Sequence, residues 1–205
     1  MTPKQRRLIF ILAGLSGVVA LGVFGFLVWM TFRNVTSPPK ATGDDRRLVL
    51  TADALVPFGA PQPDPAMETL TAVKQIDGSR TIEYEYEPPF GTQNPRVTVS
   101  CTTMVHAHSL GARQAFHFQQ LGTKGGMALI SKHAKLVDAP QLLTAGDANW
   151  AAHIRTTDGQ TTGTVFIMRQ GRVIFTVIIG GLAFDKAEDA NQLMAPLAAE
   201  AERRY

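Results

Sequence analysis

The chain has 205 residues, of which 20 are basic and 17 acidic, giving a formal net charge of +3. Lys4, Arg6 and Arg7 precede the first apolar stretch and every acidic residue follows it, so the remainder carries 20 − 3 = 17 basic residues against 17 acidic ones. This formal neutrality removes the electrostatic basis for binding nucleic acid, and no nucleic-acid partner is predicted. The single cysteine, Cys101, excludes an intramolecular disulfide.

An uncharged apolar stretch runs from Leu8 to Phe32. As a helix rising about 1.5 Å per residue, it would reach roughly 37 Å and exceed a hydrocarbon core of about 30 Å. It is longer than the apolar core of a signal peptide, and no small-x-small cleavage site follows it. We therefore predict an uncleaved single-pass membrane anchor at 8–32, in contact with the lipid bilayer.

The charges beside this anchor predict its orientation. Three basic residues precede it, whereas only Arg33 and Lys40 follow closely. The positive-inside rule then places residues 1–7 in the cytoplasm and the anchor in the inner (cytoplasmic) membrane, with a periplasmic or extracytoplasmic C-terminal domain. Trp29 and Phe32 would lie in the outer interface, which suits amphipathic rings.

Several small residues lie along the anchor, including Gly14, Gly17 and Gly25. Small residues let membrane helices approach closely, which would place another membrane subunit or a second copy against this side of the helix. Glycine is also common in membrane helices without such a contact. Both interpretations stay open.

Residues 33–66 are rich in proline and lack periodicity. Because proline fixes φ and has no amide donor, we predict a semi-rigid spacer with one short ordered piece around 48–55. A folded domain is then predicted at 67–205.

Two strands of alternating polarity are predicted near the start of this domain. In 81–87, apolar residues alternate with Glu83, Glu85 and Glu87. Such a row is typical of a solvated strand face, and it could also bind a cation or a basic partner. The second strand, 96–106, places Cys101 among valines, as expected of an inert buried thiol.

The rest of the domain alternates between helical and extended patterns. Ser109 is a suitable N-cap for a helix to about residue 121, which Gly122, Gly125 and Gly126 are expected to end. A strand is predicted over 127–137. Three further strands are predicted at 150–156, 162–169 and 172–179, joined by the X-Gly turns at 158–159 and 170–171.

The last of these strands, VIFTVIIGG, is apolar on both faces, so both faces of the sheet should be covered there. A final helix is predicted over 184–204, with a kink or restart at Pro196. The order predicts an α+β domain, an antiparallel β-sheet flanked by helices.

This arrangement resembles the PsbP-like fold, known from an extrinsic photosystem II subunit and from small bacterial lipoproteins. The resemblance covers about 70–204 and rests on the helix SLGARQAFHFQQL after a strand, the paired hairpins, and GRVIFTVIIGG before the closing helix. It implies a binding or assembly module rather than an enzyme.

One group of residues suggests metal chemistry, namely Met104, His106 and His108. Alternate side chains of a strand share a face, and thioether with imidazole suits copper. Ordinary hydrogen bonds beside a helix N-terminus are the alternative role of the two histidines.

The opening MTPKQRRL and anchor also resemble the start of the membrane-anchored haem chaperone of cytochrome c maturation, but that family's haem-attaching histidine motif is absent. The sequence therefore predicts a non-catalytic, membrane-anchored accessory or assembly protein that binds a membrane protein complex without a resident cofactor. The alternative is a periplasmic copper or haem delivery protein.

Overall fold

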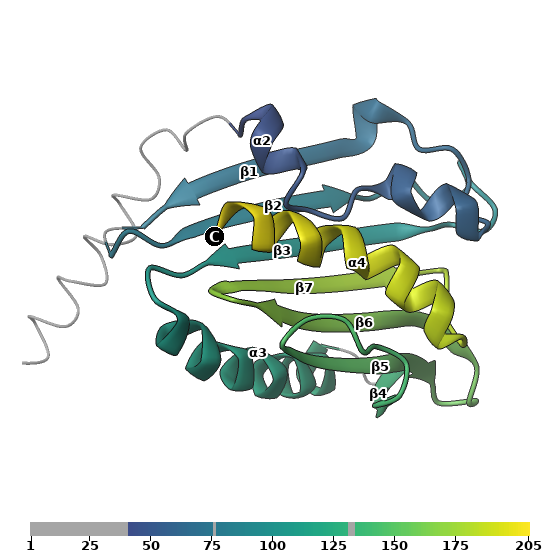
Figure 1. Cartoon of the computed structure of the whole chain (residues 1–205). Helices are drawn as coiled ribbons and strands as arrows, with labels where there is room; N and C mark the ends of the chain where they lie inside the picture. Colours follow the sequence, from purple (N-terminus) through teal and green to yellow (C-terminus); the bar gives the residue numbers. More distant parts are fainter. Residues whose placement is uncertain (1–40, 76, 131–133) are drawn as a thin grey trace, which may run out of the picture. The chain divides into compact units, whose positions relative to one another are not determined.

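The computed structural model describes residues 41–75, 77–130 and 134–205. In these ranges the chain forms one antiparallel sheet with helices on both faces (Figure 1). The strands are β1 (Glu68–Lys74), β2 (Arg80–Tyr86), β3 (Thr98–Val105), β4 (Ala134–Asp138), β5 (Ala148–Thr156), β6 (Thr161–Gln170) and β7 (Val173–Gly180). The helices are α2 (Gly43–Arg46), α3 (Ser109–Ile130) and α4 (Ala187–Arg204), with 3₁₀ helices η1 (Ala52–Phe58) and η2 (Pro65–Met67).

The strand order is β1-β2-β3-β7-β6-β5-β4, and every neighbouring pair is antiparallel. The chain leaves β3 through α3, forms the outer strand β4, and returns strand by strand until β7 pairs with β3. Gly159 and Gly171 lie in the two tight turns of this return with φ values of 88° and 58°. These left-handed conformations are the ones that glycine adopts at little steric cost. The predicted α+β class, antiparallel sheet and two turns are confirmed.

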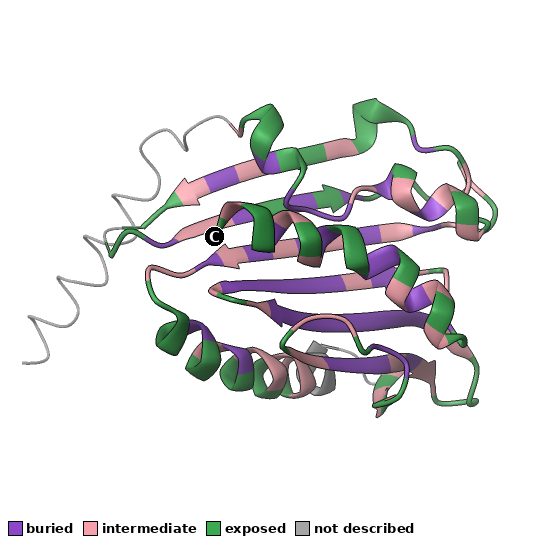
Figure 2. Ribbon diagram, in the orientation of Figure 1, coloured by how far each residue is buried: buried purple, intermediate pink, exposed green. Residues whose placement is uncertain are grey.

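The central strand β7 is buried on both faces, as its sequence predicts (Figure 2). Its odd-numbered residues, such as Phe175 and Val177, belong to a core cluster that includes α4 residues such as Leu193 and Met194. Its even-numbered residue Ile174 belongs to a second cluster on the opposite face of the sheet. That cluster contains Ala112 and Phe116 of α3. The two long helices therefore cover opposite faces of the sheet.

Residues 41–66 form part of this domain, so the predicted spacer does not extend to residue 66. Leu48, Leu50 and Leu55 are at most 3% exposed and belong to the same cluster as α4. The segment hydrogen-bonds to strand side chains, since the amide of Leu50 donates to Cys101 Sγ (3.2 Å) and the amide of Ala52 donates to the Tyr84 hydroxyl (2.9 Å). The proline-rich sequence of this segment therefore forms irregular structure that is nevertheless packed against the sheet.

Asp45 fixes the beginning of this segment to the sheet. It is 1% exposed, and its carboxylate accepts hydrogen bonds from the Thr42 amide (2.7 Å) and hydroxyl (2.8 Å). Arg80 of β2 donates to the same carboxylate oxygen at 2.6 Å and forms an ion pair with it. The buried charge is thus neutralised by a residue that is 35 positions away in the sequence.

Other predicted boundaries were wrong. The helix expected to stop at Gly122 continues to Ile130 as α3, because none of its glycines adopts the left-handed conformation of a helix stop. Of the strand expected over 127–137, residues 127–130 belong to α3 and 134–137 to β4, and strand β1 was missed. The final helix begins at Ala187 rather than 184 and continues through Pro196 without interruption.

The predicted anchor at 8–32 and its glycines lie outside the described residues. Among the residues that are described, none of the helices combines the length and the hydrophobicity needed to cross a bilayer.

We predict that Asp45→Asn lowers the free energy of unfolding by about 2–4 kcal/mol. The substitution removes the charge that Arg80 requires and weakens the cap at Thr42. Urea unfolding of the purified protein would measure this loss. Asp44→Asn is the matched control, because the Asp44 side chain is 74% exposed and should change the stability by less than about 0.5 kcal/mol. Equal effects of the two substitutions would contradict the role given to Asp45.

Candidate functional site

Among the described residues, no helix lies over one face of half of the sheet. Helix α3 packs against β4, β6 and β7, so within these ranges β1, β2 and the adjoining part of β3 have no helix on that side. We call this surface the open face. Its outward residues at the centre of the strands are polar: Thr69 and Thr71 from β1, Glu83 and Glu85 from β2, and Ser100 and Thr102 from β3.

The strand register arranges these side chains in two rows across the open face. Glu83 lies opposite Thr71 on one side and Thr102 on the other. Glu85 lies in the same way between Thr69 and Ser100. Directly opposed residues of antiparallel strands have their side chains on one face, about 5 Å apart. Each exposed carboxylate is therefore flanked by two hydroxyl groups that can donate or accept hydrogen bonds.

Of the three glutamates predicted to form one row, only Glu83 and Glu85 lie within β2 on the open face. Glu87 lies beyond the end of β2, and its carboxylate pairs with Arg96 at 2.9 Å. Glu83 and Glu85 remain exposed and bring two negative charges to a surface that is otherwise formed by hydroxyl groups and β-branched side chains. The alternation Thr69-Leu70-Thr71-Ala72 is the sequence signal that could have located the missing strand and the hydroxyl rows.

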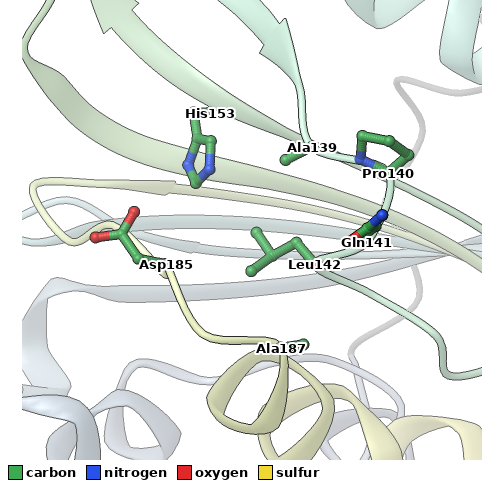
Figure 3. Close-up of a pocket in the computed structure, with 7 residues that line it drawn as sticks. All are labelled: Ala139, Pro140, Gln141, Leu142, His153, Asp185 and Ala187. Atoms are coloured by element: carbon green, nitrogen blue, oxygen red, sulfur yellow. The ribbon is translucent and has the colours of Figure 1, made fainter.

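The opposite side of the sheet carries a pocket of about 500 Å³ at the start of α4 (Figure 3). Its lining comes from the segment after β4, from β5 and from the residues around the first turn of α4. The lining residues are Ala139, Pro140, Gln141, Leu142, His153, Asp185 and Ala187. Nδ1 of His153 is buried there without a hydrogen-bond partner. No local sequence pattern links His153 with Asp185, because they lie on separate elements.

The structure places the three residues of the predicted metal site along the end of β3 and the bend that follows it. Met104 is on β3 and packs against the apolar cluster beneath α3. His106 extends the strand by one hydrogen bond, from its amide to the carbonyl of Arg172 (2.9 Å). The chain then bends at 107–108, so the alternation that places Met104 and His106 on one face does not reach His108.

His106 lies close to the first turn of α3, since a Cβ atom added to Gly111 would be 3.9 Å from its Nδ1 atom. Its Nε2 atom is buried without a hydrogen-bond partner, and burial lowers the pKa of the imidazole, an effect that the nearby Asp77 carboxylate opposes. A neutral imidazole with an unpaired nitrogen is able to bind a metal. Nevertheless, the described residues contain no cluster of three or more His, Cys, Asp or Glu side chains that could hold one.

Cys101 lies in the apolar core, as its position among valines predicts. It is completely buried, and its sulfur accepts the hydrogen bond from Leu50. Burial raises the pKa of its thiol to about 11, so the nucleophilic thiolate is disfavoured at neutral pH.

Comparison with known proteins gives one structural relationship. No protein-family model and no curated protein matches the sequence. The crystal structure of the extracellular domain of PknH from Mycobacterium tuberculosis is similar to this chain with a TM-score of 0.53. The alignment covers 82% of this chain and 99% of that domain at 12% sequence identity. The two proteins thus share a fold found in an extracellular domain, whereas no comparison links the fold to the PsbP-like family.

We predict that Cys101 in the folded protein reacts with a thiol reagent at pH 8 at least about 100-fold more slowly than in the urea-unfolded chain. Burial and the raised pKa both reduce the accessible thiolate. Colorimetric thiol titration with and without urea would measure the two rates. Rapid reaction in the folded state would show that the segment over Cys101 opens readily.

Proposed function

We propose that this chain is a non-catalytic, membrane-anchored accessory or assembly protein whose extracytoplasmic domain binds a protein of a membrane complex. The observation that carries the proposal is the open face, where Glu83 and Glu85 stand exposed between rows of hydroxyl groups. The partner surface that fits it presents lysine or arginine side chains together with backbone donors. Charge complementarity of this kind favours the correct partner and speeds its association.

The predicted anchor at 8–32 supports the location. Residues 33–40 separate the end of the predicted anchor from the first described residue, and about eight residues extended at about 3.4 Å each reach at most roughly 27 Å. The domain would therefore act close to the membrane surface. The shared fold with an extracellular domain is consistent with this placement.

The lining of the pocket does not favour covalent catalysis. It supplies an imidazole and a carboxylate, His153 and Asp185, but no serine, threonine, cysteine or lysine that they could activate as a nucleophile. The chain's only thiol is buried within the core at Cys101.

The test is affinity purification of the full-length chain from membranes in mild detergent, followed by mass spectrometry. We expect membrane proteins in stoichiometric amounts with the native chain. Glu83→Lys combined with Glu85→Lys should reduce their recovery by about tenfold, because like charges would then face each other. Raised salt should weaken the native association in the same direction.

Glu188→Lys combined with Glu202→Lys is the matched control, since it makes the same change of charge at exposed positions of α4. The control should keep the native recovery. Recovery of the bare chain without any partner would contradict the proposed function. An equal loss with both double variants would contradict the role of the open face.

A second proposed function, delivery of copper or haem, is favoured by one observation, the unpaired buried Nε2 of His106. Met104 on the same side of β3 would add a thioether, and His108 would have to approach from the bend. Metal analysis of the purified chain after incubation with copper and dialysis would test this function. His106→Ala combined with His108→Ala should abolish about one bound copper per chain, and unchanged binding would end the idea.

A further inference from the structure

Helix α3 exposes a row of large apolar side chains on the side that faces away from the sheet. Leu110, Phe118 and Leu121 have exposed fractions of 66%, 74% and 66%. At about 100° per residue, they fall within roughly 80° of one another around the helix. The inward side is packed separately through Ala112 and Phe116. The outward row is therefore an additional apolar surface, and surfaces of this kind mark interaction sites.

Two glycines next to this row are not required sterically by the described residues. Gly122 and Gly125 are exposed, neither has a positive φ, and a Cβ atom added to either would meet nothing within 4 Å. Glycine in a helix interior is less favourable than alanine by roughly 0.5–1 kcal/mol. The fold itself would accept alanine at both positions. What glycine provides is a notch in which another backbone or a large side chain can approach the helix closely.

We propose that the outward side of α3 binds α3 of a second copy of this chain in antiparallel orientation. The large side chains Leu110 and Phe118 lie in the first half of the helix, Leu121 lies just past its middle, and the glycine notch at Gly122 and Gly125 follows in the second half. A two-fold axis at Phe118 places residue 110 of each copy opposite residue 126 of the other. Each Leu110 then reaches the notch beside Gly125, and the two Phe118 rings meet at the axis.

In a two-fold symmetric dimer, the same surface of each copy must supply both the projecting side chains and the notch that receives them. The outward side of α3 supplies both. Antiparallel helices also bring opposite ends of their dipoles together. The charges on α3 do not oppose the contact strongly. The helix carries two basic residues and no acidic one, and Lys124 is already paired with Asp138 at 2.8 Å.

The contact is independent of the open face and can exist without the proposed partner. A single helix pair is smaller than a typical stable interface, so we expect weak, concentration-dependent dimers. Anchoring in one membrane would raise the effective concentration of the copies and favour the pair.

Sedimentation of the full-length chain in mild detergent, over a 100-fold range of protein concentration, tests the proposal. We expect a reversible monomer–dimer equilibrium. Phe118→Asp should raise the dissociation constant by at least about tenfold, because it places two charges at the axis. Phe90→Asp is the matched control, since Phe90 is an equally exposed phenylalanine on another part of the surface (86%). The control should leave the dissociation constant unchanged.

Gly125→Leu separates loss of the dimer from loss of folding. Leucine fills the notch and should weaken the dimer by about tenfold, whereas the urea midpoint of the monomer should stay the same or rise because leucine favours helix. A chain that remains monomeric at every concentration would overturn the proposal. So would a dimer that survives both Phe118→Asp and Gly125→Leu.

Oxidative cross-linking tests the antiparallel orientation, since the buried Cys101 leaves an introduced cysteine as the reactive thiol of the folded domain. Phe118→Cys should form a disulfide between two copies on treatment with diamide. Leu110→Cys should not, because the two copies of residue 110 would be roughly 24 Å apart at about 1.5 Å per residue. Disulfides at both positions would indicate parallel helices and overturn the arrangement. A monomeric Phe118→Cys variant whose introduced thiol is protected from reagent would also overturn it, and would assign the surface to the bilayer or to residues 1–40.

Discussion

The arrangement of this domain depends on a difference between its strands. β6 and β7 are apolar on both faces, whereas β2 is apolar on one face and acidic on the other. A strand that is apolar on both faces must be covered twice, and one with an acidic face must leave that face in water. Helix α3 therefore has one favourable position, over the β4–β7 half of the sheet. Both surfaces to which we assign binding follow from that position, because the helix leaves the open face uncovered and turns its own outer side to solvent.

On the other face of the sheet, α4 shares the covering with residues 48–55, a segment that forms no strand and enters the 3₁₀ helix η1 at Ala52. These residues supply apolar side chains, but their backbone groups do not pair with a neighbouring strand. Side chains of β2 and β3 provide partners instead: Tyr84 and Cys101 accept from backbone amides, and the Thr103 hydroxyl donates to the carbonyl of Leu48. Burying this segment without such partners would cost several kcal/mol. A tyrosine and a cysteine of the apolar core thus also hold the N-terminal segment in place.

The difference between local patterns and contacts made by distant residues explains which parts of the fold could be predicted from the sequence. Local patterns were sufficient for β2, β3 and the three strands from β5 to β7, because alternation and X-Gly turns act within about ten residues. They failed where distant contacts decide the structure. The glycines of α3 indicate a helix stop when the helix is considered alone, whereas the helix continues to Ile130 and packs on the sheet through Ala112 and Phe116. The proline-rich segment becomes structured through Asp45 and Arg80, a pair that no local pattern connects. In the candidate metal site, the strand pattern reaches only Met104 and His106, because His108 lies beyond the bend at 107–108.

The glycines of α3 also show how a feature without a structural role can point to function. Glycines at Gly146 and Gly181 are explained by the fold, since an added Cβ would lie 2.6 Å from Met168 or would overlap the carbonyl oxygen of Arg96. Gly122 and Gly125 face open space in the same domain. The described residues supply no contact that compensates for the helix propensity lost at these two positions, which is why we infer that a neighbouring molecule supplies it. The proposed pairing of two α3 helices would supply such a contact, because Leu110 of each copy would fill the space beside Gly125 of the other.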